Sequence, residues 1–224
     1  MFVKDSTYIA IYVDDLLLIG LNKADIQQIK DQLSQQFSMT DLGPIAFYLG
    51  ITVTCDHKNR ILRLGQKSYL QEAIITIGLW DSPPQKTPMN TSCLEPAGED
   101  YCAEPEFKTQ YQSAVGTLMY AMLGTRPDIA YAISSVSRYA ANPTPAHIAA
   151  VKRILSYLKG TIDLQLTFRG ELTDLIGYLD SDWGGDPITH RSTARFVFNI
   201  RSGAISWSSK RQPTVALSTC EAEY

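Results

Sequence analysis

The stretch "TYIAIYVDDLLLIG", Thr7–Gly20, places two adjacent acids between two apolar runs. The runs Tyr8–Val13 and Leu16–Ile19 are short and rich in aromatic and aliphatic residues, which is typical of strands. A tight polar turn between two such runs predicts a β-hairpin. The hairpin would carry Asp14 and Asp15 at its tip.

The Asp14–Asp15 pair has two interpretations. Aspartate is common in turns because its side chain bonds to the nearby backbone, and for the pair taken alone this interpretation is favoured. Alternatively, the hairpin presents two carboxylates that bind divalent cations. The remainder of the chain has to decide between them.

The composition is that of an ordinary globular protein. The 224 residues are 45% hydrophobic and 19% charged, enough for one large domain or two small ones. The four cysteines lie far apart without a C-x-x-C pair, which argues against a zinc site and a disulfide scaffold. No apolar run approaches the roughly 20 residues that cross a bilayer, and the N-terminus "MFVKDS" is not typical of a signal peptide. We therefore expect a soluble, intracellular protein with no membrane partner.

The charge is unevenly distributed along the chain. The net charge is -3, yet residues 102–212 carry 12 Lys/Arg and 9 Asp/Glu. This modest basic excess fits a segment that follows a phosphate backbone, and it equally fits a solvated surface.

The expected elements follow a mixed α+β order. After the hairpin, residues 22–37 predict a helix capped by Asn22 or Asp25, and strands are expected around 46–54 and 60–64. A short helix over 67–79 precedes the loop 81–100, the best candidate for a domain boundary. Helices are then expected within 107–123, 126–140 and 144–160, strands within 175–183, 195–200 and 204–210, and a strand-to-helix passage over 214–224.

The third of these helices has the clearest signals. Thr144 is the expected cap, Pro145 takes the first helical position and Gly160 ends the helix. Three helices with short connections predict a compact bundle. The expected core face consists of Ile148, Val151, Leu155 and Leu158, and the basic side chains elsewhere on the helix are Lys152, Arg153 and Lys159.

A second group of acids lies in the last quarter of the chain. Asp180 and Asp182 end an apolar strand in "GYLDSDWGGD", and Glu221 and Glu223 lie in the last residues. Carboxylates from a strand end and a neighbouring helix are typical of a site for two Mg²⁺ ions. For any one of these acids alone, capping or solvation is the better explanation.

At this point the sequence resembles a known family. "YVDD" in an apolar hairpin is the signature of reverse transcriptases, and almost the whole chain resembles the Pol polyprotein of copia-type LTR retrotransposons. The ordered series is far more specific than the hairpin alone. The matching stretches are "FSMTDLGPIAFYLGITV", "TPMN", "YQSAVGTLMYAMLGTRPDIAYAISSVSRYAANPTPAHIAAVKRILSYLKGT", "GYLDSDWGGD" and "ISWSSKRQPTVALSTCEAEY".

The resemblance implies a division of the chain into four parts. Residues 1–80 would be the C-terminal part of the reverse transcriptase palm, with a partial β-sheet and helices. Residues 81–105 would be a linker loop and 106–168 a helical thumb. Residues 169–224 would be the first strands of an RNase H-like fold.

The resemblance also implies roles for individual residues. Asp14 and Asp15 would be the catalytic, metal-binding pair of the palm, with Mg²⁺ or Mn²⁺ as cofactor. Asp180 and Glu221 would be the first two catalytic, metal-binding acids of the RNase H site, with Asp182 and Glu223 supporting. The positions implied to contact nucleic acid are Tyr12, Val13, Phe47 in the primer-gripping hairpin, and Lys152, Arg153 and Lys159 of the thumb.

The resemblance further implies the partners: an RNA/DNA template–primer hybrid, dNTPs and the remaining Pol segments. The location would be cytoplasmic, in a virus-like particle, or nuclear, and not secreted. Working sites of both kinds take further carboxylates, so we expect this chain to be inactive alone. A non-catalytic remnant that at most binds nucleic acid, or a structural module whose acids only cap, are the alternatives.

One local departure from the family pattern lies in "RSTARF", Arg191–Phe196. The family usually has a small residue and Gly where this chain has Ala194 and Arg195. The arginine puts the start of the expected strand in doubt and indicates drift without selection.

Overall fold

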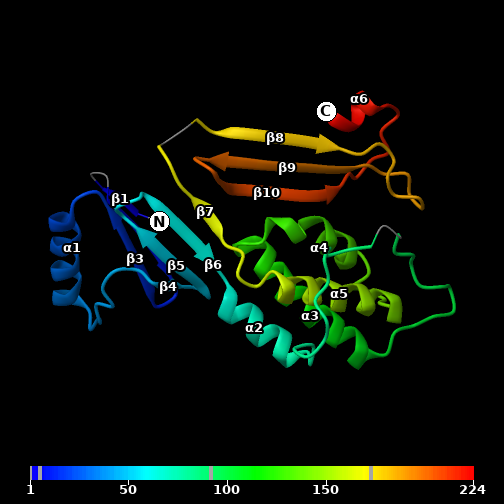
Figure 1. Cartoon of the computed structure of the whole chain (residues 1–224), viewed down its shortest axis with the longest axis horizontal. Coiled ribbons are helices and arrows are strands. Elements are labelled where there is room, and N and C mark those ends of the chain that lie inside the picture. Colours follow the sequence, from blue (N-terminus) through cyan, green and yellow to red (C-terminus); the bar gives the residue numbers. More distant parts are fainter. Residues whose placement is uncertain (1, 5–6, 91–92, 172–173) are drawn as a thin grey trace. The chain divides into compact units, whose positions relative to one another are not determined.

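A computed structural model describes residues 2–4, 7–90, 93–171 and 174–224. These residues form a mixed α+β fold with three antiparallel sheets and six α-helices (Figure 1). The expectation of an α+β class is thereby confirmed. The chain divides into two compact units, Met1–Ile45 and Ala46–Tyr224. Within the described ranges, none of the helices combines the length and apolar character needed to cross a membrane.

The first unit is a three-stranded sheet with one helix. The helix α1 (Lys23–Gln36) lies close to its predicted position, and Asn22 rather than Asp25 caps it. The Asn22 side chain accepts a hydrogen bond from the Ala24 backbone N–H at 2.9 Å, satisfying one of the orphan donors of the first turn. The sheet runs in the order β1 (Phe2–Lys4), β2 (Thr7–Tyr12) and β3 (Asp15–Gly20).

The second unit begins with a four-stranded sheet whose first predicted strand is interrupted. Leu49 and Gly50 have φ values of 48° and 72°, and such backbone cannot continue a strand. The segment "FYLGI" is therefore a tight hairpin, in which Tyr48 pairs with Ile51. The sheet order is β4 (Phe47–Tyr48), β5 (Ile51–Asp56), β6 (Ile61–Gly65) and β7 (Leu166–Phe168).

The helical part of this unit holds the main core. Val151, Leu155 and Leu158 of the third predicted helix are fully buried, and Ile148 packs against them. The expected core face is thus confirmed, because residues three and four apart share one side of a helix. The helices are α2 (Lys67–Thr76), α3 (Pro105–Gly124), the 3₁₀ turn η1 (Pro127–Ile129), α4 (Ala130–Ser137) and α5 (Pro145–Gly160).

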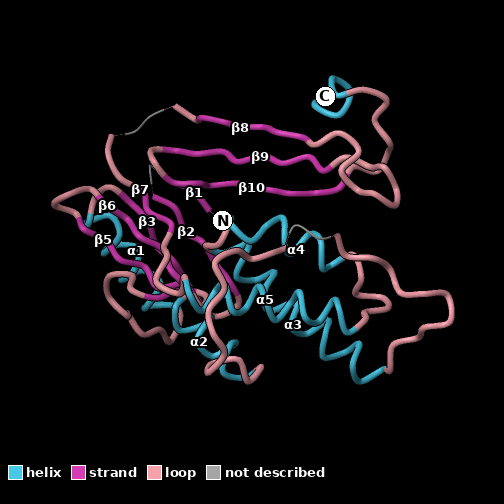
Figure 2. The backbone as a smooth tube through the Cα atoms, turned by 45° about the vertical axis from the view of Figure 1, so that its right-hand side comes forward, coloured by secondary structure: helices cyan, strands magenta, loops and turns pink. Residues whose placement is uncertain are grey.

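A third sheet lies against α4, with its strands side by side in the order β10-β9-β8 (Figure 2). Of the strand-to-helix passage expected over 214–224, the structure contains the short helix α6, and the described residues 214–217 before it form no strand. Leu217 N–H donates to Glu221, and the Ala216 carbonyl accepts from Trp183 Nε1. The bounds are β8 (Ile176–Ser181), β9 (Thr193–Ile200), β10 (Gly203–Arg211) and α6 (Thr219–Glu223).

Candidate functional site

The tip of the first hairpin is one residue earlier than the sequence predicts. Tyr12 pairs directly with Asp15, so the two-residue turn is Val13–Asp14. Asp15 is the first residue of β3 rather than part of the turn. The two acids therefore differ in backbone setting: Asp14 stands at the apex of the turn and Asp15 at the base of a strand.

The apex of this hairpin is strained. Val13 has φ of 52°, in the left-handed region that a β-branched side chain rarely adopts. Strained residues of this kind persist only where the surrounding structure enforces them, and they cluster at functional sites. The strained backbone at Val13 therefore favours a functional role for the neighbouring Asp14 and Asp15, and this argument does not depend on the sequence resemblance.

Both acids of the hairpin are exposed, and in the part of the chain that the structure describes neither carboxylate has a hydrogen-bond or ion-pair partner. Hard oxygen ligands of this kind suit Mg²⁺ or Mn²⁺. Magnesium is usually held by one or two carboxylates together with waters and substrate phosphates. The residues fit such an ion, although the described ranges contain no group of three or more His, Cys, Asp or Glu that could hold a metal.

Replacing Val13 with glycine is expected to stabilise the hairpin by about 1 kcal/mol, because glycine adopts positive φ without steric cost. The measurement is amide hydrogen exchange of β2 and β3 in the full chain, which should slow about fivefold. Val3→Gly, in the regular strand β1, is the matched control and should speed exchange. Faster exchange in Val13→Gly would show that the turn is not strained.

The second acid pair has a positively charged neighbour. Arg195 lies directly opposite Asp180 in the β8–β9 pairing, and its guanidinium lies 3.3 Å from Asp180 and 3.3 Å from Asp182. The expectation that Arg195 disturbs the start of this strand is wrong. The strand β9 begins at Thr193 and pairs regularly with β8 through Arg195. An arginine is accommodated in this strand because it forms ion pairs across it.

The two C-terminal glutamates are held by backbone groups. Glu221 Oε2 accepts a hydrogen bond from Leu217 N–H at 2.7 Å, and Glu223 Oε1 accepts one from Ser181 N–H at 3.3 Å. The structure thus brings Glu223 to the end of β8. Within the described ranges it does not gather Asp180 and Glu221 into a group of acids able to hold a metal.

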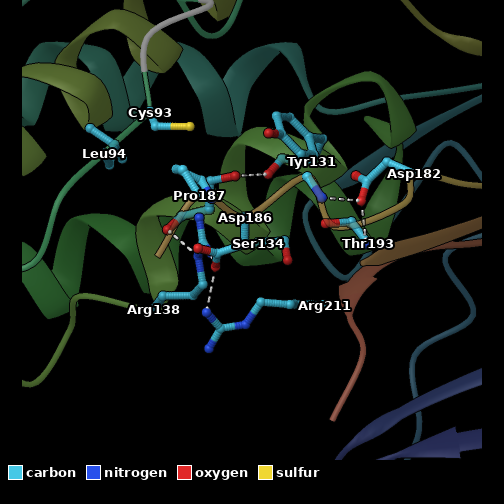
Figure 3. A pocket seen from close by; sticks show the side chains of 12 residues that line it. Cys93, Leu94, Tyr131, Ser134, Arg138, Asp182, Asp186, Pro187, Thr193 and Arg211 are labelled. Carbon is cyan, nitrogen blue, oxygen red and sulfur yellow. Dashed lines mark hydrogen bonds and ion pairs between the residues drawn. The ribbon is translucent and has the colours of Figure 1, made fainter. Parts of the chain in front are cut away.

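Sequence reasoning missed Asp186, a buried carboxylate. Arg138, directly after α4, and Arg211 of β10 each donate to its Oδ2 atom at 2.6 Å. Figure 3 shows both arginines beside Asp186. Its Oδ1 atom accepts the backbone N–H groups of Ile188 and Thr189. The only signal in the sequence is the turn-like "GGD", which gives no indication of two arginine partners.

The residues predicted to contact nucleic acid differ in their surroundings. Tyr12, Val13 and Phe47 are exposed by more than half. Lys152 is exposed on α5. Arg153 donates to Gln85 and Thr87, and Lys159 donates to the carbonyls of Trp80 and Ser82, so both attach the loop after α2 to α5. A role of these side chains in binding nucleic acid stays a prediction.

Comparison with known proteins identifies the class. The sequence model of the family described as "Reverse transcriptase (RNA-dependent DNA polymerase)" matches residues 1–91, which include the hairpin. No solved structure matches the chain.

The relatives identify the particular branch. The chain is 41% identical to the "Retrovirus-related Pol polyprotein from transposon TNT 1-94" of Nicotiana tabacum, over 96% of this chain and 16% of that polyprotein. It is 37% identical to an uncharacterized mitochondrial protein of Arabidopsis thaliana, over 97% of this chain and 88% of the relative. A transposon Ty5-1 protein of Saccharomyces cerevisiae is 31% identical over 97% of this chain and 70% of its own length. The chain therefore belongs to the reverse transcriptases of copia-type retrotransposon Pol polyproteins.

Proposed function

We propose that residues 1–80 are the C-terminal part of a reverse transcriptase palm, 81–105 a linker, 106–168 the thumb and 169–224 the N-terminal part of an RNase H-like domain. The hairpin form of "FYLGI" and the helical core after the loop support this division. Because the chain spans 16% of the tobacco polyprotein, extension of DNA on an RNA or DNA template is proposed for the whole Pol protein.

The observation that carries the proposal is the pair of exposed, unpartnered carboxylates at the strained hairpin tip, within the described residues. Asp14 and Asp15 would hold a divalent cation, which when bound neutralises charge on the phosphoryl group undergoing transfer. Of the two, Asp14 at the apex of the turn would be the more directly catalytic acid. The exposed side chains of Tyr12 and Val13 border the pair and would contact the primer end.

The other proposed contacts follow from the helical part. Lys152, exposed on α5, would contact the phosphate backbone of a template–primer hybrid. The remaining segments of the Pol polyprotein are proposed partners, and an intracellular location is proposed with them. A non-catalytic module that only binds nucleic acid remains the second function, supported by Lys152 and the basic excess of residues 102–212.

The test is a Mn²⁺ titration of the ¹⁵N-labelled chain, because the paramagnetic ion broadens NMR signals close to its binding site. We expect broadening of the amides from Tyr12 to Leu16 at millimolar metal, since two exposed carboxylates bind such ions weakly. Asp14→Asn combined with Asp15→Asn should abolish it.

Asp25→Asn is the matched control, since Asp25 is an exposed acid on α1 of the same unit. It should leave the broadening at the hairpin unchanged. Broadening at the hairpin that survives the Asp14/Asp15 double substitution would contradict the proposed metal-binding role.

A further inference from the structure

The acids at the end of β8 have a positively charged neighbour in the adjacent strand β9. Asp180 lies in β8 and Asp182 follows directly after its last residue, Ser181. Arg195 occupies the cross-strand position opposite Asp180, close enough for side chains to interact. Its Nη1 donates to Asp180 Oδ2 and its Nη2 to Asp182 Oδ2, each at 3.3 Å.

Further contacts hold this arginine in place. The guanidinium carbon lies 5.4 Å from the centre of the Tyr131 ring, a cation–π contact from α4. A single exposed ion pair contributes little, since a long side chain loses freedom for one contact. Here the planar guanidinium of Arg195 contacts two carboxylates and one aromatic ring. Three contacts therefore offset the conformational entropy lost by ordering one side chain.

The acceptors of Asp182 are already used within the chain. Its Oδ1 atom accepts the backbone N–H groups of Gly185 at 3.1 Å and Thr193 at 2.9 Å (Figure 3 shows the Thr193 contact). Its Oδ2 atom accepts from Arg195. Both oxygens of Asp182 are thus already engaged within the chain, so a metal ion at this carboxylate would compete with the Arg195 ion pair and with the turn between β8 and β9.

Asp180, one of the acids implied to bind metal in an RNase H-like centre, and its supporting neighbour Asp182 therefore do not fit a divalent cation in this setting. Arg195 is permanently charged, so its charge cannot be removed by a change of pH in the physiological range. An incoming divalent ion would meet a positive charge at the location where it needs two negative ones.

We propose that Arg195 takes the place of a divalent cation at Asp180 and Asp182, so that this acid pair is closed to metal by an internal ion pair. The inference rests on the proposed assignment of residues 169–224 to an RNase H-like domain. It gives the two acid pairs of the chain opposite properties: Asp14–Asp15 binds metal, and Asp180–Asp182 excludes it.

The experiment is the Mn²⁺ titration applied to Arg195→Gln and Arg195→Lys. Glutamine keeps a polar amide donor but removes the charge and shortens the side chain, whereas lysine keeps the charge at a similar length. We expect Arg195→Gln to bind Mn²⁺ at least about tenfold more tightly at the amides of residues 179–183, because the repulsion of a neighbouring charge is removed. The wild type and Arg195→Lys should show no broadening there at the same metal concentration.

Two further measurements localise the effect. Asp180→Asn should abolish the gained broadening in the Arg195→Gln background and change nothing in the wild-type background. The dispersed amide signals of β8, β9 and β10 verify that each variant is folded. Equal broadening near Asp180 in wild type and Arg195→Gln, or none in either, overturns the inference. Signals at the hairpin in the same spectra report on the proposed function separately.

Discussion

Replacing Asp186 with asparagine is expected to lower the free energy of unfolding by about 3 kcal/mol. The Asp186 side chain is 7% exposed and accepts hydrogen bonds from Arg138 and Arg211 at 2.6 Å each. Asparagine keeps the size but not the charge, so two guanidinium groups would face a neutral amide. The loss lies at the lower end of the range for a broken buried ion pair, because both arginines keep some contact with solvent.

The same carboxylate predicts how stability changes with pH. Burial alone would raise the pKa of Asp186, but hydrogen bonds from Arg211 and from the backbone of Ile188 and Thr189 hold the pKa well below its ordinary range. Because the folded-state pKa is lower than the unfolded value of about 3.9, the stabilisation is present above that value and is lost as the pH falls below it.

Chemical denaturation of the full chain between pH 7 and pH 3 tests both the loss of stability in Asp186→Asn and the pH dependence. The wild type should lose stability more steeply than Asp186→Asn below about pH 4. Asp163→Asn, which removes the exposed Lys67–Asp163 ion pair, is the matched control and should change the free energy of unfolding by less than about 0.5 kcal/mol. An equally small effect of Asp186→Asn would show that the ion pairs of Asp186 with Arg138 and Arg211 do not stabilise the fold.

The elements of this fold were predictable where a local pattern determines them. The apolar face of α5 and its cap at Thr144 follow from helical spacing and capping chemistry, and the structure confirms both. The break after Tyr48 was missed, because Leu49 adopts positive φ although leucine carries no turn signal. The hairpin was predicted but its turn was displaced by one residue, since aspartate is a more typical turn residue than Val13.

The contacts that define the acid sites were less predictable, because they join residues far apart in sequence. Asp186 and Arg138 are separated by 48 positions, and neither is marked by its neighbours. Arg195 departs from the family pattern, and in the sequence alone this departure indicates drift rather than an ion pair. Its pairing with Asp180 depends on the register of two strands, which a sequence fixes only weakly where both faces carry polar residues.

The second large effect is expected at Asp128, which neutralises the deeply buried Arg126. The Arg126 side chain is 2% exposed, and two of its nitrogens donate to the Asp128 carboxylate at 2.9 and 2.7 Å. Its other hydrogen bonds go to the backbone and hydroxyl oxygens of Thr161, at the end of α5. Burial opposes ionisation of Asp128, but Arg126 outweighs it and lowers the pKa of the carboxyl.

Asp128→Ala is expected to destabilise the chain by about 3–5 kcal/mol, because it leaves a buried guanidinium without a counter-charge. Arg126→Met should cost less, about 1–2 kcal/mol, since methionine fills the space with apolar atoms and Asp128 is 32% exposed to water. Chemical denaturation of both single variants and the double variant measures this asymmetry. In the double variant the buried charge is absent, so adding Asp128→Ala to Arg126→Met should cost little more. An equal loss of unfolding free energy in the two single variants would contradict the assignment of Arg126 as a buried charge that Asp128 neutralises.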